Sequence, residues 1–342
     1  MRIGQFDTAQ DVLIIAEIGN NHEGNPQVAE ELVHRAAEAG VQAVKFQTFR
    51  TELFVAPSQA ERFARMKRFE LSQETFAHLA RVARDKGLLF ISTPLDCESA
   101  AFLDGIVDAV KVASGDNTFY PLIEQVAATD KPLIISGGLA DLDELAYTKA
   151  LVDKVRHESG RHGHGRAADL ALLHCVSAYP VAPEQANLAA VRTLAARFPD
   201  CTIGYSDHTL GVTAPVLAVA AGARIIEKHF TLDRNFSEFR DHQLSADPAM
   251  LRQLVEEVRE AQTLLGSGAK VAQPDEAAAL TAIRRSIAAR RDLTAGAVVG
   301  PDAIVWIRPG DGIPPGQEAR VLGRRLKANV AAGTLLTDDV LE

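Results

Sequence analysis

The sequence predicts a (β/α)₈ barrel followed by a small β-rich domain. Short apolar segments, each followed by a longer stretch with helical spacing, recur along the first part of the chain. Strands that are apolar throughout and alternate with helices are typical of a parallel sheet covered by helices, and eight such units fit a closed barrel. A doubly wound open sheet is the alternative, but no GxGxxG follows the first segment. The eight apolar segments cover residues 13–19, 43–48, 88–94, 109–114, 132–138, 170–176, 202–208 and 225–232.

The connecting stretches predict helices. They are rich in Ala, Leu, Glu and Arg, with apolar residues at i, i+3 and i+4. Such stretches cover residues 28–39, 73–86, 121–129, 141–155, 188–198 and 212–221, and 250–265 is predicted as the final amphipathic helix.

The chain divides by composition into a barrel domain (1–265), a linker (266–280) and a small domain (281–342). The linker is rich in Gly and polar residues, and the last part has short β-like runs broken by Gly and Pro. This last part contains a weak internal repeat, because Ala295-Gly296-Ala297-Val298 is matched by Ala332-Gly333-Thr334-Leu335. A module of this size is marginal alone, so we expect it to dock on a partner.

Composition and charge exclude several classes of protein. The formal net charge of -9 argues against a general binder of nucleic acid, and the basic run 283–291 is interpreted as a solvated face. Neither a secretory signal nor an apolar run long enough to cross a membrane is visible. Three cysteines without CxxC spacing favour reduced thiols, and we expect a cytoplasmic protein. The loop 157–169, with His157, His162 and His164, is interpreted as a surface insertion rather than a metal site.

Polar residues gather where the predicted strands end. In a barrel of this kind the active site lies at the C-terminal ends of the strands, so these residues are the candidates for chemistry. They are Glu17, Lys45, Gln47, Ser92, Thr93, Asp96, Lys111, Ser114, Asp116, Ser136, Ser177, Tyr179, Ser206, Asp207, His208, Glu227, Lys228 and His229.

His208 and His229 predict a metal site. They close consecutive strands, and neighbouring strands lie about 4.8 Å apart, so the two imidazoles could share one ion. Imidazoles with nearby carboxylates and water suit a borderline divalent cation. A hydrogen-bonded structural role is the alternative for either histidine taken alone.

Lys45 and Lys111 predict an anion site. Each interrupts an apolar strand, and a buried ammonium is costly unless an anion or a carboxylate compensates it. With hydroxyls at Ser114, Ser136 and Ser206, the two lysines would cradle a small ligand carrying phosphate and carboxylate. Neutralisation by barrel carboxylates such as Glu17 is the alternative.

Several motifs together resemble the sialic acid (N-acetylneuraminate) synthase family. They are AEIGNNHEG (16–24), VKFQT (44–48), STPLD (92–96), VKVASGDN (110–117), GYSDHT (204–209) and EKHFTLD (227–233). The small domain, with RRS (284–286) and IRPGDGI (307–313), resembles that family's antifreeze-like (SAF) domain. The motifs cover almost the whole chain in the family's order.

The resemblance implies an enzyme that condenses phosphoenolpyruvate with an N-acetylated amino sugar to give a nonulosonic acid and phosphate. It implies Mn²⁺ or Mg²⁺ held by His208 and His229, and a domain-swapped homodimer in which Arg308 closes the partner's sugar site. Glu17, Asp116, Glu227 and Asp241 are then the candidate catalytic residues. The candidate substrate-binding residues are Lys45, Gln47, Lys111, Ser114, Ser136, Ser177, Tyr179, Ser206 and Arg308.

The sequence departs from the family pattern at positions that we expect to cluster near the acceptor sugar. Asp116 stands for a usual glutamate, Ser177 for a usual asparagine and Ile307 for a usual lysine. The segment SEFRDHQLS (237–245) replaces a usual PGPDH and adds Arg240. The acceptor would be N-acetylmannosamine or a related bacterial hexosamine, such as a legionaminic, pseudaminic or spore-coat precursor.

Two other functions stay open from the residues. One is a Schiff-base lyase acting on 2-keto sugar acids, with Lys111 or Lys228 as the nucleophilic amine. The other is a non-catalytic sugar-binding barrel.

Overall fold

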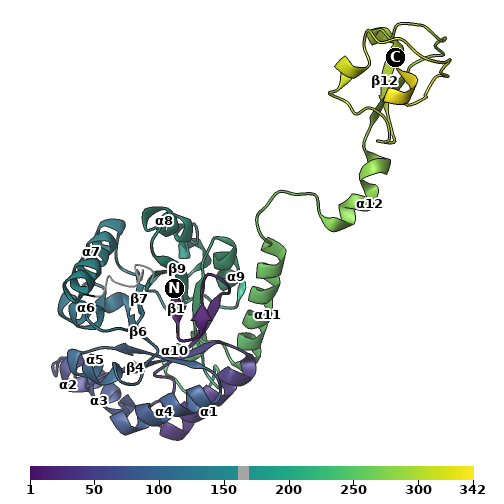
Figure 1. Cartoon of the computed structure of the whole chain (residues 1–342). Helices are drawn as coiled ribbons and strands as arrows, with labels where there is room; N and C mark the ends of the chain where they lie inside the picture. The colour runs from purple at the N-terminus through teal and green to yellow at the C-terminus, as the bar shows by residue number, and fades with distance from the viewer. Residues whose placement is uncertain (161–168) are drawn as a thin grey trace. The chain divides into compact units, whose positions relative to one another are not determined.

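Eight parallel strands close into a barrel in the computed structural model, which describes residues 1–160 and 169–342 (Figure 1). Each strand pairs with its neighbours in chain order, and β10 closes the ring by pairing with β3. The predicted (β/α)₈ barrel is confirmed. The strands are β3 (Leu13–Gly19), β4 (Ala43–Thr48), β5 (Leu89–Pro94), β6 (Ala109–Val112), β7 (Leu133–Ser136), β8 (Leu170–Cys175), β9 (Thr202–Asp207) and β10 (Ile225–His229).

Side chains alternate between the inside of the barrel and its helical coat. On β3, Leu13 and Ile15 belong to the inner apolar core, whereas Ile14, Ala16 and Ile18 pack with the helices. This period of two is a property of every β-strand, so each strand offers every second residue to the interior. The inner core is completed by Ala43, Ile91, Ala109, Ile134, Ala171, Leu173 and Ile225.

A short hairpin closes the N-terminal end of the barrel. It consists of β1 (Arg2–Ile3) and β2 (Phe6–Asp7), which pair in antiparallel fashion. Met1 and Ile3 pack into the inner core, so this end is sealed by apolar side chains. The opposite end, where the strands terminate, is therefore the end that can open to a ligand.

In the described part of the chain, α-helices form the outer layer of the barrel (Figure 1). Local signals define their ends: the side chain of Asn25 caps α1, Pro26 occupies its first turn, and Gly40 ends it with φ of 87°. The helices are α1 (Pro26–Ala39), α4 (Gln73–Asp85), α5 (Cys97–Leu103), α6 (Tyr120–Ala127), α7 (Leu142–Glu158), α8 (Ala190–Arg197), α9 (Thr213–Ala220) and α11 (Pro248–Leu265).

Two segments beside the strand ends fold into helices that the sequence analysis did not predict. After β4 the chain forms α2 (Thr51–Phe54) and α3 (Ala60–Phe69), and after β10 it forms α10 (Arg240–Leu244). Met66 and Phe69 anchor α3 in a separate small core that also contains Phe49, Val55 and Leu95. The spacing of Met66 and Phe69 is helical, but the segment is short and lies directly before a stronger helical pattern.

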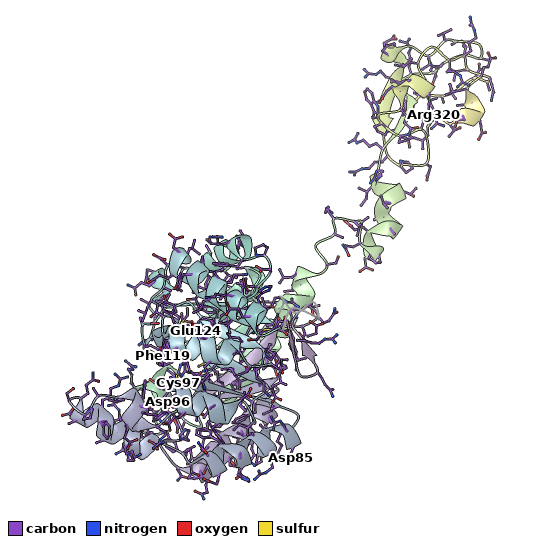
Figure 2. The ribbon with its side chains drawn as sticks, turned by 60° about the vertical axis from the view of Figure 1, so that its left-hand side comes forward. Asp85, Asp96, Cys97, Phe119, Glu124 and Arg320 are labelled. Carbon is purple, nitrogen blue, oxygen red and sulfur yellow. The ribbon has the colours of Figure 1, made fainter. Side chains whose placement is uncertain are left out.

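Asp96 has a structural role rather than a place in the site. Its carboxylate accepts hydrogen bonds from the backbone N–H groups of Ser99 at 2.7 Å and Arg50 at 2.8 Å. The first bond caps α5, so Asp96 lies beside Cys97 at the start of that helix (Figure 2). The second hydrogen bond joins the segment after β4 to the segment after β5.

The chain forms two compact units, Met1–Gly266 and Ser267–Glu342. The second unit begins with α12 (Pro274–Ile283), in a region where the sequence predicts a linker. Pro274 and a capping box between Gln273 and Glu276 explain why a helix forms there.

The second unit is β-rich around its own small core. Its antiparallel pair is β11 (Ser286–Ala289) with β12 (Ile304–Ile307), and single bridges join other segments, including Leu293 with Val330. The two copies of the internal repeat share local structure. Gly296 has a φ of 75° and Gly333 a φ of 82°, so both are in the left-handed region. The short 3₁₀ turns are Pro301–Ala303, Glu318–Arg320 and Asp338–Val340. The core residues include Ile287, Val299, Ile304, Ile313, Val321, Leu326, Leu336 and Leu341.

In the described part of the chain, each helix is too short or too polar to traverse a lipid bilayer.

Gly204 on β9 provides a test of the barrel's packing. A Cβ at this position would lie 2.4 Å from Leu173 Cδ2 and 2.6 Å from the Ile225 carbonyl oxygen. We expect Gly204→Ala to lower the free energy of unfolding by about 1–3 kcal/mol because the neighbouring strands must move apart. A Cβ at Gly115 meets nothing within 4 Å, so Gly115→Ala is the matched control. Equal denaturation midpoints for the two variants would contradict this packing.

Candidate active site

A cavity of about 370 Å³ opens at the C-terminal ends of the barrel strands. Its floor consists of residues that the strand period turns inward, and its rim comes from α3 and α10. The structure brings most of the predicted site residues together here. They are Glu17, Lys45, Gln47, Lys111, Ser114, Ser136, Tyr179, Ser206, His208, Glu227, His229 and Asp241.

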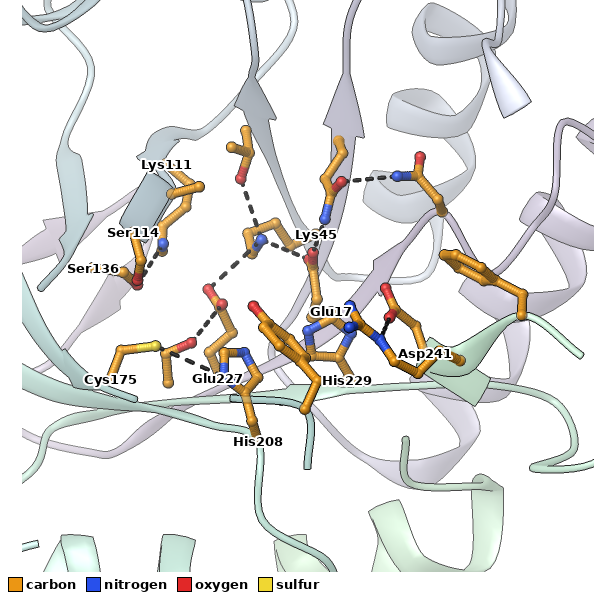
Figure 3. Close-up of a pocket in the computed structure, with 18 of the residues that line it drawn as sticks. Glu17, Lys45, Lys111, Ser114, Ser136, Cys175, His208, Glu227, His229 and Asp241 are labelled. Atoms are coloured by element: carbon orange, nitrogen blue, oxygen red, sulfur yellow. Dashed lines mark hydrogen bonds and ion pairs between the residues drawn. The ribbon is translucent and has the colours of Figure 1, made fainter. Parts of the chain in front are cut away.

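Lys45 lies between two carboxylates at the centre of the floor (Figure 3). Its Nζ is 2.6 Å from Glu17 Oε2 and 3.8 Å from Glu227 Oε2, and it donates to Thr93 Oγ1 at 3.2 Å. Burial alone would lower the pKa of Lys45, but the two carboxylates raise it above its ordinary value. Lys45 therefore stays an ammonium and links the two sides of the cavity.

Glu17 and Glu227 lie in different electrostatic environments. Burial raises the pKa of Glu17, and Glu227 adds to this effect against the opposing charge of Lys45. Burial also acts on Glu227, but Lys111 and Lys45 outweigh it and lower the pKa of Glu227. The two carboxyl groups thus differ in proton affinity, which suits them to different roles in one reaction.

Lys111 is a buried cation without a close carboxylate. Its Nζ donates to Ser136 Oγ at 2.6 Å and to the Val112 carbonyl at 2.9 Å (Figure 3). Within the described residues, no carboxylate oxygen lies within 4 Å of this nitrogen. Burial lowers the pKa of Lys111 as a result, in spite of Glu227. A bound anion would offset the cost of burying this ammonium, so the surroundings of Lys111 suit the predicted anion site.

Three serines complete this part of the floor. Ser114 Oγ accepts from the Gly138 N–H at 3.2 Å, and Ser206 Oγ donates to Glu227 Oε1 at 3.0 Å. Ser136 binds Lys111. The predicted alternative, in which barrel carboxylates neutralise the lysines, therefore applies to Lys45 and not to Lys111.

His208 and His229 face each other with ring centroids 5.3 Å apart. His208 Nδ1 lies 2.8 Å from the Val176 carbonyl, so in the neutral ring Nδ1 carries the proton and Nε2 carries the lone pair. His229 Nδ1 is buried and has no hydrogen-bond partner in the described part of the chain. Burial and nearby cations lower the pKa of His229 well below its ordinary value, so this imidazole is neutral.

The histidine pair fits a divalent cation that takes two nitrogen ligands from the protein. Neutral imidazole is a ligand that Mn²⁺ and related ions accept, and the unpartnered Nδ1 of His229 lacks any other role. Across the described ranges, no group of three or more His, Cys, Asp or Glu side chains is placed to hold a metal ion. The remaining ligands would have to come from substrate and water.

Tyr179, Arg240 and Asp241 form one wall above the histidines. The ring of Tyr179 lies 4.1 Å from that of His208, and the Arg240 guanidinium lies 4.8 Å above the same tyrosine ring. Asp241 Oδ1 is 3.6 Å from Arg240 Nε and has no hydrogen bond in the described structure. Burial raises the pKa of Asp241, and Arg240 opposes the effect.

Asp116 and Ser177 do not line this cavity. Asp116 ends the 3₁₀ turn Ser114–Asp116; burial raises the pKa of its carboxyl group, and the charge of Lys111 opposes this effect. Ser177 Oγ is buried against the backbone of Gly138 and belongs to a neighbouring cavity of about 640 Å³. Arg308 belongs to the second unit, where it is exposed, and its role stays a prediction.

The structure adds residues that the sequence analysis did not assign to the site. Cys175 is buried on the floor with Sγ 3.8 Å from His208 Nδ1, and its inward position follows from the period of β8. Arg62 and Arg65 reach the cavity from α3, so only a prediction of that helix could have found them. The other additions are Phe54, Met66, Ala113, Phe239 and Arg240, whereas Thr93, a candidate from the strand ends, also lines the cavity.

Two further sequence interpretations concern residues outside the cavity. Lys228 points into the helical coat, fully buried, and donates to Asp207 Oδ2 at 2.6 Å and to the Thr209 carbonyl at 2.5 Å. It cannot reach a substrate in the cavity, which removes it as a Schiff-base lysine. His162 and His164 lie outside the described residues.

Comparisons with known proteins agree with this architecture. A model of the NeuB family matches residues 32–270, and a model of the SAF domain matches residues 284–342. An uncharacterized protein of Methanocaldococcus jannaschii is 43% identical over 93% of this chain and 91% of its own length. The N,N'-diacetyllegionaminic acid synthase of Legionella pneumophila is 40% identical over 96% of this chain and 94% of its own length.

A solved structure supports the same assignment. The N-acetylneuraminic acid synthetase of Leptospira borgpetersenii superposes with a TM-score of 0.75 and is 34% identical, covering 82% of this chain and 94% of that one. The predicted resemblance and the C-terminal SAF domain are both confirmed. This chain belongs to the NeuB family.

Proposed function

We propose that this protein condenses phosphoenolpyruvate with an N-acetylated amino sugar to give a nonulosonic acid and inorganic phosphate. The observation that carries the proposal is the cavity floor, where the uncompensated ammonium of Lys111 and two imidazoles share one cavity. The names of the Legionella and Leptospira relatives, both synthases of nonulosonic acids, support this reaction. The acceptor would be N-acetylmannosamine or a related bacterial hexosamine.

Phosphoenolpyruvate would bind on the floor around Lys111. Its phosphate and carboxylate bring the negative charge that Lys111 lacks, and the hydroxyls of Ser114, Ser136 and Ser206 can donate to their oxygens. Lys45 would interact with the same ligand from its position 2.6 Å from Glu17 Oε2.

A divalent cation, Mn²⁺ or Mg²⁺, would be held by His208 and His229 and would polarise the aldehyde oxygen of the open-chain sugar as a Lewis acid. Tyr179 and Asp241 line the wall beside these histidines and would bind the sugar hydroxyls. Gln47, which donates to Glu17 Oε1 at 3.1 Å, orients that carboxyl group toward the same space.

The residues account for each proton and bond of the reaction. The C3 carbon of phosphoenolpyruvate attacks the aldehyde carbon, and the aldehyde oxygen takes a proton as the new C–C bond forms. Glu17, whose pKa is raised by burial, would donate that proton. Water then adds at C2, and ionised Glu227 could accept the first of its protons. The bond between C2 and the phosphate oxygen then breaks, the second water proton leaves with the phosphate, and the 2-keto acid remains.

The first test measures phosphate release from phosphoenolpyruvate with Mn²⁺ across a panel of N-acetylated hexosamines. We expect release with at least one sugar and its loss when a chelator is added. Sugar binding without any release of phosphate would favour the non-catalytic barrel instead.

His208→Ala is expected to abolish turnover and to weaken Mn²⁺ binding, because it removes one of two protein nitrogens from the site. Turnover is followed by phosphate release, and metal affinity by calorimetric titration with Mn²⁺ alone. His78→Ala, on the exposed surface of α4, is the matched control. Unchanged Mn²⁺ affinity in His208→Ala would show that the metal assignment is wrong.

Lys111→Met is expected to raise the KM for phosphoenolpyruvate about 10- to 150-fold, because a charge-assisted contact is lost. Its thermal stability should equal or exceed that of the wild type, since the lost ammonium has no carboxylate partner. Lys86→Met, an exposed change, is the control. A borohydride-trapped pyruvate adduct on Lys111 of the wild type would instead establish the Schiff-base lyase.

We also propose a cytoplasmic homodimer in which the SAF domains are exchanged, so that Arg308 acts on the site of the other copy. The test mixes inactive His208→Ala with Arg308→Ala under conditions of subunit exchange. Exchange of domains would restore activity, because every mixed dimer contains one intact site formed by a wild-type barrel and a wild-type SAF domain. No recovery despite verified mixed dimers would show that each SAF domain serves its own barrel.

A further inference from the structure

The segment between β3 and α1 makes contacts that the proposed reaction does not use. Residues 20–24 of this segment are here called the β3 turn. Asn20 lines the active-site cavity, whereas other residues of the β3 turn bind the segment after β10, which contains α10. The β3 turn therefore joins two connections that are more than 200 residues apart in the sequence.

Glu23 binds two side chains of the segment that contains α10. Its Oε1 lies 3.2 Å from His242 Nε2, and it accepts a hydrogen bond from the hydroxyl of Ser237. His242 is the third residue of α10, and its side chain is fully buried. One carboxylate therefore holds both the helix and the residues just before it.

The surroundings of His242 fix the orientation of its ring. Nδ1 lies 2.6 Å from Thr231 Oγ1, and the rings of Phe236 and Phe239 lie 5.0 Å and 5.9 Å from the imidazole. Burial lowers the pKa of His242, although Glu23 opposes this effect, so the ring is neutral. A carboxylate accepts hydrogen bonds and donates none, so Nε2 carries the proton of the neutral ring and donates to Glu23.

A second residue of the β3 turn binds the end of α10. Asn21 Nδ2 donates to Ser245 Oγ at 3.0 Å and to the Phe230 carbonyl at 2.8 Å. Ser245 directly follows α10, and its hydroxyl donates to the Asp241 carbonyl at 2.5 Å. The β3 turn therefore contacts α10 both at its middle and at its end.

The backbone of the β3 turn is held in an uncommon conformation. Glu23 has a φ of 47° and Gly24 a φ of 82°, so two consecutive residues are in the left-handed region. This region is unfavourable for a glutamate, and such a conformation persists where the surrounding structure holds it. A Cβ at Gly24 would lie 2.0 Å from the Arg68 carbonyl oxygen, so the turn also packs against the end of α3.

Asp241 is the residue that connects these contacts with the site. It precedes His242 and lines the active-site cavity, where its Oδ1 is buried and has no hydrogen bond in the described part of the chain. A helix as short as α10, with five residues, has little stability of its own. Its position must therefore come from contacts with neighbouring segments, and the β3 turn supplies polar contacts of this kind.

We propose that Glu23 is a positioning residue, which acts through His242 and Ser237 to hold Asp241 in place beside the histidine pair. The inference rests on the proposed function, in which Asp241 binds a hydroxyl of the sugar. In the described structure Glu23 does not line the active-site cavity, so its effect reaches the substrate through α10.

The test compares Glu23→Ala and Glu23→Gln with the wild type, using an N-acetylated sugar that supports phosphate release. We expect Glu23→Ala to raise the KM for the sugar about tenfold, because Asp241 loses its fixed position, and to leave the KM for phosphoenolpyruvate within about twofold. Glu23→Gln keeps an oxygen that can accept from both His242 and Ser237, so it should keep both KM values close to those of the wild type.

A double-mutant cycle separates positioning from a general loss of structure. If Glu23 acts through Asp241, adding Glu23→Ala to Asp241→Asn should raise the KM for the sugar by less than about twofold. Glu30→Ala is the matched control, because it removes an exposed contact of 2.9 Å between Glu30 and His78, and it should change neither KM. Additive effects in the cycle, or equal rises in both KM values, would overturn the inference.

Hydrogen exchange provides a measurement that does not depend on turnover. We expect Glu23→Ala to speed amide exchange in residues 237–245 about tenfold, whereas β3 in this variant and both segments in Glu23→Gln should keep the rates of the wild type. Unchanged exchange in Glu23→Ala would show that the inference is wrong even if the reaction proceeds as proposed. Faster exchange in a protein whose wild type releases no phosphate would contradict the proposed function and still support the role of Glu23 in placing α10.

Discussion

The alternation of side chains along eight parallel strands is the constraint on which the site depends. The same phase that turns Leu13 and Ile15 into the inner core turns Glu17 into the cavity. On β10, Ile225 belongs to the inner core, and Glu227 and His229 follow it at intervals of two. The site is thus a polar layer stacked directly on an apolar one, and neither can shift without the other.

This stacking explains why the site contains charges that are costly to bury. The apolar layer below and the helices outside keep water away from Lys45 and Lys111. The groups that stabilise their charges must therefore come from other strands. Lys45 obtains two carboxylates, whereas Lys111 obtains a hydroxyl and a carbonyl oxygen. In the free protein, the ammonium of Lys111 therefore lacks an opposite charge. A ligand that supplies this charge gains binding energy from the new interaction.

The period of two also determines how far the sequence could predict the structure. Strands such as LIIAEIG are mostly apolar, so their existence was predictable, and the period of two then places Glu17 on the inward face. Asp116 and Ser177 lie just beyond the last strand residues, where turn geometry and not strand period sets direction. Helix α3 was missed because its apolar face is only two buried residues, Met66 and Phe69.

The floor and the rim of the cavity are built from different parts of the barrel. Floor residues lie on or next to hydrogen-bonded strands, whose positions the closed barrel fixes. Rim residues lie on α3 and α10, which are anchored by small contacts such as that between the Phe69 and Phe239 rings, 5.1 Å apart. A connection between strands can change its side chains without disturbing the barrel. Changes in these connections can therefore alter the rim of the cavity while the floor stays in place.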